Sequence, residues 1–256
     1  MAAELKRERR AIYLYGITES APRKHPELMG VDRLATVEVI ECEKIYCWTS
    51  RVSSLEFEKN LARNMENLDW LAETSVAHQR VIAAIARHAE ILPARLGTIF
   101  RTENSLCSHI AKRARSLQKD FERVRGSDEW GVKVFEIPPP LSRLPKVRSG
   151  KDYLKAKAAL LPARRDNSRA DVEIAKLEKA LQKVAVDCAP AGNVSRGQHG
   201  LKFQTTLLVK RSSQKKLGSI LEKFARDWTS ERRIECTGPW PPYSFVSRPG
   251  DGARPK

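Results

Sequence analysis

The 256-residue sequence lacks any run of about 18 apolar residues, and its charged residues 1–10 are not followed by the apolar h-region of a secretory signal peptide. The first absence argues against a membrane-spanning helix, and the second argues against a secretion signal. We therefore expect a cytoplasmic protein that makes no use of a membrane. With 41% hydrophobic and 30% charged residues, the composition is that of a folded globular protein.

Cysteine is scarce and scattered. The five cysteines are an odd number and include no Cys-x-x-Cys pair, which argues against a disulfide framework and against a zinc ribbon. Cys42 and Cys47 flank a predicted hairpin and could approach one another, but buried, reduced thiols are the more usual outcome for strand cysteines in a reducing compartment. We expect all of the thiols to be reduced. They are Cys42, Cys47, Cys107, Cys188 and Cys236.

The common catalytic motifs are also missing. The sequence has no phosphate-binding glycine loop, no Gly-x-Ser-x-Gly elbow and no His-Glu-x-x-His helix. His78 and His88 share one predicted helix, but ten residues of helix separate them by about 15 Å along its axis, too far to share a metal ion. We expect no enzyme activity, no catalytic residues, no cofactor and no metal site.

Positive charge is abundant and unevenly placed. Residues 1–140 carry 22 basic and 20 acidic side chains, whereas residues 141–256 carry 25 and 11, which places nearly all of the net charge of +16 in the second half. Such a half either is simply solvated or attracts an acidic partner, such as a nucleic acid, an anionic surface or an acidic protein assembly.

Residues 1–94 are predicted to form an α+β unit with three strands and one helix. The apolar run 11–17 is typical of a buried strand, and 34–42 and 44–53 are rich in β-branched and aromatic residues around a short link. From Trp70 to Ile91 the apolar residues recur with helical spacing, after Asp69 as a candidate N-cap.

Residues 95–247 have the order βαβ, insertion, βαβ. Helices are predicted over 103–124 and 214–228, and strands are predicted over four segments: 94–101, 130–137, 201–210 and 231–237. This order predicts a ferredoxin-like, split-βαβ domain, with two helices on one face of a four-stranded sheet. The expected fold class is α+β with two domains, 1–94 and 95–247.

A helical insertion is predicted at about 149–190. A first helix ends near Leu161, and a thin apolar stripe from Val172 to Val184 marks a second, strongly charged helix. The second helix either closes a hairpin with the first or waits for a partner helix. Residues 248–256, which are basic and rich in proline and glycine, are predicted to be a disordered tail.

The segment 237–245 combines stiff and aromatic residues. Three prolines favour an extended backbone, and the three rings lose little entropy when they are ordered, so the segment suits partner binding. It could equally cover the sheet edge of its own domain. In a ribbon of alternating side chains, we expect a division in which Trp240 and Phe245 are largely internal and Tyr243 is partly exposed. The candidate partner-binding residues are Trp240, Pro241, Pro242, Tyr243 and Phe245.

Nucleic-acid binding has weak support in the sequence. A split-βαβ sheet can stack bases on exposed aromatic residues, but the strands 130–137 and 201–210 carry no RNA-binding signature. Phe135 and Phe203 are better explained as core residues. This alternative therefore depends on the charge of the second half alone.

Several segments together resemble the gas vesicle protein F/L family over residues 11–247. The most specific match is Thr-Gly-Pro-Trp-Pro-Pro-Tyr-Ser-Phe at 237–245. The supporting segments are 13–17, 77–78, 91–100, 129–134 and 149–154.

The resemblance implies an accessory protein of gas vesicle formation that is associated with the vesicles. It implies the same two-domain fold, contact with the hydrophobic shell protein and with other accessory gas vesicle proteins, and no enzyme activity. The basic second half departs from this pattern. A hydrophobic wall subunit needs binding surfaces during assembly, which agrees with a sequence that lacks catalytic motifs.

Overall fold

A computed structural model describes residues 10–21, 27–137, 167–190, 198–228 and 231–247. The described residues of 1–129 and 239–256 form one compact unit, and those of 130–238 form a second. The chain passes between the units within two strands, β6 (Ser127–Glu136) and β9 (Arg232–Trp240). None of the helices in the described part of the chain has the length and apolar character needed to cross a membrane.

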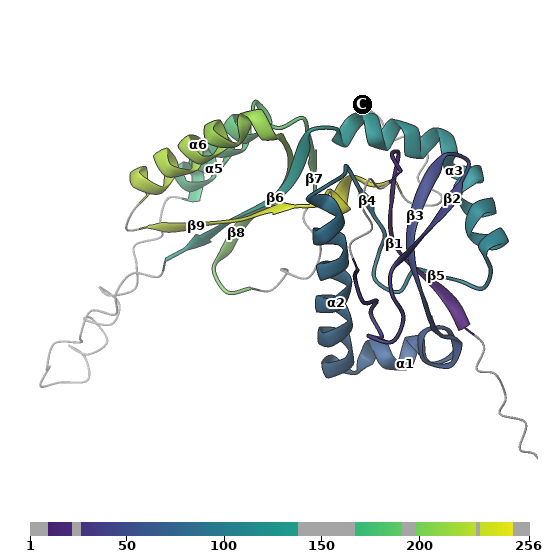
Figure 1. Cartoon of the computed structure of the whole chain (residues 1–256). Coiled ribbons are helices and arrows are strands. Elements are labelled where there is room, and N and C mark those ends of the chain that lie inside the picture. Colours follow the sequence, from purple (N-terminus) through teal and green to yellow (C-terminus); the bar gives the residue numbers. More distant parts are fainter. Residues whose placement is uncertain (1–9, 22–26, 138–166, 191–197, 229–230, 248–256) are drawn as a thin grey trace, which may run out of the picture. The chain divides into compact units, whose positions relative to one another are not determined.

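The first unit is built on a sheet in which β1 (Arg10–Thr18) is central (Figure 1). The strand order is β2-β3-β1-β4, and β5 also pairs with β1. Every residue from Ala11 to Thr18 is buried, which explains the continuous apolar run, because a central strand covered on both faces needs no polar alternation. The other strands are β2 (Glu38–Cys42), β3 (Ile45–Ser53), β4 (Leu92–Pro93) and β5 (Ile99–Phe100).

Helix α2 (Leu68–Ala86) covers one face of this sheet. Its buried residues, among them Val81 and Ile85, pack with Tyr13 and Tyr15 of β1. The Asn67 side chain accepts hydrogen bonds from two backbone N–H groups of the first turn, so Asn67 is the N-cap and the predicted cap at Asp69 was wrong. The short helices η1 (Leu55–Lys59) and α1 (Leu61–Glu66) precede α2.

Helix α3 (Glu103–Val124) belongs to the first unit and has the predicted bounds. Its buried Ile110 and Leu117 line a pocket together with Leu14 of β1, whose side chain points to the face opposite Tyr13 and Tyr15. The sheet therefore lies between α2 and α3.

Two sequence-based expectations are corrected here. The predicted strand 94–101 is reduced to β5, which pairs with β1, and α3 packs on the same sheet, so neither belongs to the domain expected to begin at residue 95. The first unit accordingly has five strands rather than three. Local periodicity identified the elements but could not show which sheet they join.

Cys42 and Cys107 form a disulfide between β2 and α3, with 5.0 Å between their Cα atoms. The expectation of five reduced thiols was therefore wrong for this pair, because the fold brings together two residues that are 65 positions apart. Cys47 faces Ile40 across the hairpin instead of approaching Cys42, and its free thiol is buried.

The second unit contains a four-stranded sheet of order β7-β8-β6-β9. The elements follow one another as β6, α5, β7, β8, α6 and β9. Their bounds, beyond those of β6 and β9, are α5 (Asn167–Gln182), β7 (Asp187–Ala189), β8 (Leu201–Lys210) and α6 (Gln214–Asp227). The predicted strand over 201–210 is confirmed, and it neighbours β6 as expected.

Helix α5 contributes to the core of the second unit. Leu177, Leu181 and Val184 pack with Leu207 of β8 and Leu217 of α6. Leu177, Leu181 and Val184 of the predicted apolar stripe are thus covered by the unit's own core, whereas Val172 at its start is 54% exposed. The first predicted helix of the insertion and the predicted tail 248–256 lie outside the described residues.

A half-buried carboxylate joins three elements of this unit. The Glu173 carboxylate of α5 accepts hydrogen bonds from Nε1 of Trp228 and from the guanidinium of Arg232, each at 3.0 Å. The Arg232 guanidinium also lies 4.8 Å from the centre of the Trp228 ring. Because each buried donor has an acceptor, this cluster can stabilise the packing of α5 against the end of α6 and the start of β9.

Candidate functional site

The predicted partner-binding segment forms the end of β9 and a short turn of 3-10 helix at Tyr243–Phe245. Phe245 is fully buried and Tyr243 is half-buried, as expected, but Trp240 is 44% exposed. The expectation that Trp240 would be internal was wrong, because the chain leaves the strand after Trp240 and turns, which breaks the alternation of side chains. Pro242 is buried and Pro241 is half-buried.

A buried carboxylate of α3 holds the end of this segment. Asp120, which is 2% exposed, accepts hydrogen bonds from both the backbone N–H and the hydroxyl of Ser247, each at 2.8 Å. Arg123 donates to Asp120 at 2.6 Å and also to the carbonyl of Phe245. The backbone of 245–247 is therefore fixed to one turn of α3.

A second carboxylate repeats this arrangement three residues earlier. Glu129 accepts the backbone N–H of Ser244 at 2.7 Å and the Ser244 hydroxyl at 2.8 Å. Burial raises the pKa of the Glu129 carboxyl, and the two bonds from Ser244 oppose that shift. The Tyr243 hydroxyl donates to Oε1 of Gln79 on α2 at 2.5 Å.

The sequence analysis did not predict these two carboxylate–serine pairs, Asp120 with Ser247 and Glu129 with Ser244, which we together call the clamp. Its signal was present, since Asp120 interrupts the apolar face of a helix between Leu117 and Phe121, and a carboxylate in that position requires donors. What the sequence did not show was that the donors are Ser244 and Ser247, more than one hundred residues away. The aromatic motif is thus partly a structural anchor, with Trp240 left exposed at its beginning.

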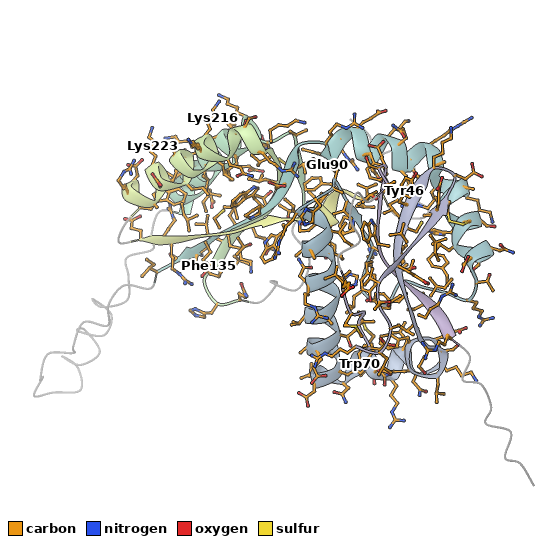
Figure 2. The ribbon with its side chains drawn as sticks, viewed as in Figure 1. Tyr46, Trp70, Glu90, Phe135, Lys216 and Lys223 are labelled. Carbon is orange, nitrogen blue, oxygen red and sulfur yellow. A yellow bond between two sulfur atoms is a disulfide. The ribbon has the colours of Figure 1, made fainter. Side chains whose placement is uncertain are left out.

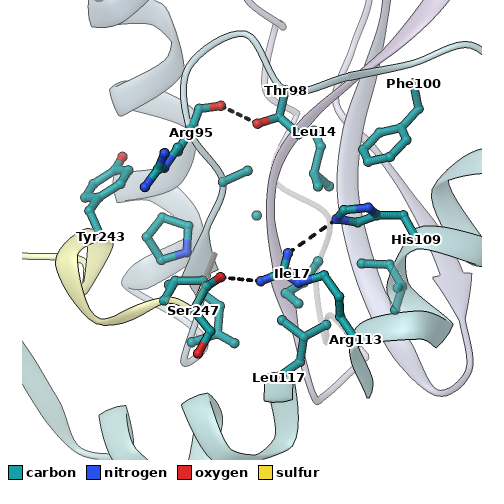
Figure 3. A pocket seen from close by; sticks show the side chains of 16 residues that line it. Leu14, Ile17, Arg95, Thr98, Phe100, His109, Arg113, Leu117, Tyr243 and Ser247 are labelled. Carbon is teal, nitrogen blue, oxygen red and sulfur yellow. Dashed lines mark hydrogen bonds between the residues drawn. The ribbon is translucent and has the colours of Figure 1, made fainter. Parts of the chain in front are cut away.

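A pocket of about 250 Å³ lies beside the clamp, within the first unit (Figure 3). β1, β4, the residues after β4, α3 and the C-terminal segment all contribute side chains. The apolar part of the lining includes Leu14, Ile17, Leu92, Leu117 and Val246.

The polar part of the pocket is cationic or neutral. Arg95, His109 and Arg113 line it. Arg113 donates to the carbonyl of Ser247 and lies 3.3 Å from Nε2 of His109. Burial, and secondarily the charge of Arg113, lowers the pKa of His109, so we infer that Nε2 of a neutral His109 accepts from Arg113. The side chain of Arg113 thus links α3 to the C-terminal segment (Figure 3).

A buried network fixes the wall of the pocket that follows β4. Nδ1 of His78 lies 2.9 Å from the Tyr13 hydroxyl, and its Nε2 lies 3.2 Å from the carbonyl of Ala94. The Tyr13 hydroxyl also accepts the backbone N–H of Gly97 at 3.2 Å. Burial lowers the pKa of His78 to about 4, so a neutral ring can serve both contacts, accepting from Tyr13 and donating to Ala94. This supports the interpretation of His78 as a structural residue.

The described residues contain no group of three or more His, Cys, Asp and Glu side chains that could hold a metal ion. His78 is buried in α2, whereas His88 is exposed just after the end of this helix. The structure therefore does not bring these two histidines together.

Comparison with known proteins agrees with the fold. The sequence model of the family described as "Gas vesicle synthesis protein GvpL/GvpF" matches residues 11–247. Gas vesicle protein L from a Streptomyces species is 31% identical over 208 residues, which cover 74% of each chain.

Two solved structures resemble the whole chain. The gas vesicle protein GvpF from an Anabaena species has a TM-score of 0.68 at 16% identity, covering 94% of this chain and 99% of that one. GvpF from Microcystis aeruginosa has the same TM-score and identity, with 93% and 99% covered. At this identity the structures show the shared fold, while the family follows from the sequence match over nearly all of the chain. The chain belongs to the gas vesicle synthesis protein GvpL/GvpF family.

Proposed function

We propose that this protein is an accessory component of gas vesicle formation that binds the hydrophobic shell protein and other accessory gas vesicle proteins. In this role it nucleates or guides assembly, works in the cytoplasm in association with the vesicles, and catalyses no reaction. Membership of the GvpL/GvpF family and the resemblance to a curated gas vesicle protein L support the proposal.

The observation that carries the binding role is the exposure of Trp240. A tryptophan that is 44% exposed is a typical anchor for a protein partner, because it adds a large apolar area at little entropic cost. The residues that follow it are tied to Glu129 and Asp120 through Ser244 and Ser247. Trp240 is thus attached to an ordered segment, so binding a partner does not carry the entropy cost of ordering a loop.

The buried polar groups favour a binding protein over an enzyme. Asp120 and Glu129 are occupied by the backbone and hydroxyl groups of two serines, and His78 is occupied by Tyr13 and Ala94. These groups would be the natural candidates for acid-base chemistry, but each serves to fix the chain. Their arrangement supports a scaffold for surface contacts.

We further propose that the second unit, residues 130–238, is a ferredoxin-like domain. The element order β6-α5-β7-β8-α6-β9 and the sheet order β7-β8-β6-β9 support this. In this assignment α5 is one of the two helices of the domain, in the place that the sequence analysis gave to residues 103–124.

Nucleic-acid binding remains the rival function and loses part of its support. Phe135 is buried beneath the guanidinium of Arg233, and Phe203 packs against the core, so neither offers an open ring for stacking. Lys216 and Lys223 project from α6 (Figure 2), but the same helix carries Glu222 and Asp227. Much of the basic excess lies in 138–166, outside the described residues.

The proposal is tested by deleting the gene from its gas vesicle cluster and scoring vesicles by electron microscopy. Complementation with Trp240→Ala should restore few vesicles, and the purified variant should retain less shell protein in a pull-down while melting at the wild-type temperature. Leu68→Ala, which removes an even more exposed apolar side chain of the first unit, is the control. Normal vesicles in the deletion strain would reject the assembly role.

A further inference from the structure

The pocket beside the clamp combines an apolar interior with a cationic rim. None of its sixteen lining residues is an aspartate or a glutamate, while Arg95 and Arg113 both line it. The Arg95 side chain is exposed, and the structure shows no ion pair for its guanidinium among the residues it describes. An uncompensated arginine at the edge of an apolar cavity favours a ligand that is apolar at one end and carries a carboxylate nearby.

The size of the pocket limits what can fill it. A volume of about 250 Å³ lies below the roughly 300–1,000 Å³ that is typical of small-molecule sites. It is sufficient for one or two side chains projecting from another protein. A protein partner also leaves the neighbouring backbone outside, where an acidic residue can reach Arg95.

The walls are fixed before any ligand arrives. Gly16 lies so close to β4 that an added Cβ would be 2.8 Å from the carbonyl oxygen of Leu92. Ser247 is held by both Asp120 and Arg113, and the Ala94 carbonyl lies within hydrogen-bonding distance of His78. A preformed cavity costs little ordering on binding, which favours specific recognition of one short motif.

We propose that this pocket is the docking site for an apolar side chain of a partner protein, with an adjacent aspartate or glutamate of that partner paired to Arg95. The inference rests on the proposed function, since it assigns one contact of the assembly role to a defined site. It does not require Trp240 to bind the same segment.

The test uses the full chain and a panel of overlapping 15-residue peptides that cover the shell protein and the accessory proteins of the same gas vesicle cluster. Isothermal titration should find at least one binding peptide in which an apolar residue neighbours a carboxylate. Arg95→Glu should raise its dissociation constant about tenfold or more, because an attractive contact becomes repulsive. Val246→Phe, which fills the cavity, should also weaken binding.

Matched variants make the result specific. Arg63→Glu makes the same charge change at an exposed position of α1, outside the pocket lining, and should leave the dissociation constant within about twofold. Replacing the peptide's acidic residue with its amide should weaken binding to the wild type but hardly affect binding to Arg95→Gln. Circular dichroism confirms that each variant is folded.

The outcomes separate the two proposals. Unchanged binding to both Arg95→Glu and Val246→Phe overturns the pocket proposal, as does binding of sodium decanoate in the absence of any binding peptide. If intact shell protein binds the chain but no peptide does, the pocket proposal falls and the proposed function stands. If neither the intact shell protein nor any peptide binds, both fall.

Discussion

Ser247 gives both its backbone N–H and its hydroxyl to the carboxylate of Asp120, each at 2.8 Å, and this pair fastens the end of the described chain to α3. Asp120 is almost completely buried, so its charge is tolerated only because these donors and Arg123 surround it. The neighbouring pair of Glu129 and Ser244 has the same form.

Removing the Asp120 carboxylate should loosen the C-terminal segment. We expect Asp120→Ala to lower the free energy of unfolding by about 2 to 3 kcal/mol, because the donors of Ser247 and Arg123 lose a buried acceptor. Urea unfolding measures the loss, and limited proteolysis should show earlier cleavage near residue 247. Glu122→Gln, on an exposed position of the same helix, should change stability little. Equal stability of Asp120→Ala and the wild type would contradict the clamp.

Glu129 should make stability depend on pH. Because burial raises its pKa, the folded protein binds this proton more tightly than the unfolded chain does. The contribution of Glu129 is fully present below the unfolded pKa of about 4.3 and declines as the pH rises through the folded pKa. Glu129→Gln keeps an acceptor and a donor for Ser244 but cannot titrate. The stability of the wild type minus that of the variant should fall between pH 4 and pH 7 in urea titrations. A difference that rises or stays flat would contradict this assignment.

The disulfide should be detectable and stabilising in protein purified without reductant. Closing a loop of 65 positions by a cross-link stabilises a fold by up to about 4 kcal/mol in the chain-entropy account. Cys42→Ser should therefore melt earlier than the wild type under oxidising conditions and similarly to it in dithiothreitol. Cys188→Ser, at an exposed free thiol, is the control. Alkylation of Cys42 and Cys107 without prior reduction would show that the bond is absent.

The Glu173 cluster should be a stabilising element of the second unit. Glu173→Ala leaves the Trp228 indole N–H and the largely buried Arg232 without this acceptor, so we expect a loss of about 2 to 3 kcal/mol in the free energy of unfolding. Glu178→Ala removes an exposed carboxylate from the same helix and should change stability by less than about 0.5 kcal/mol. Tryptophan fluorescence during urea unfolding measures both. Similar losses in the two variants would show that the cluster contributes nothing specific.

The sequence predicted the individual elements better than their assembly. α3 has the bounds that its apolar spacing predicted, and β8 has the predicted bounds as well. By contrast, β5 joins β1 although it follows β1 by more than eighty residues, and no local pattern specifies that pairing. The same reason hid the Cys42–Cys107 bond.

The candidate site was predictable only in part. Composition alone marks 237–245 as unusual, since three prolines and three aromatic residues fall within nine positions. Which of its side chains are buried and which form hydrogen bonds depends on partners that are distant in sequence. Phe245 is buried, and Ser244 binds Glu129. Trp240 was assigned the wrong environment because the side chains were assumed to alternate through 240–245, whereas β9 ends at Trp240 and the chain then turns.

His78 should make the first unit sensitive to acid. Burial lowers its pKa to about 4, whereas an unfolded histidine titrates near 6.5. The stability that the neutral ring contributes is therefore present above about pH 6.5 and is lost as the pH falls towards 4, by as much as about 3 kcal/mol. His78→Gln can still donate to Ala94 and accept from Tyr13, but it cannot be protonated in this range. The wild type should thus lose more stability than this variant between pH 7 and pH 4.5, in a direction opposite to the effect of Glu129.

His88→Gln, at an exposed position after α2, is the control and should behave as the wild type does. If His78→Gln and the wild type lose stability in parallel as the pH falls, His78 does not contribute to stability as a buried neutral ring, and this interpretation is wrong.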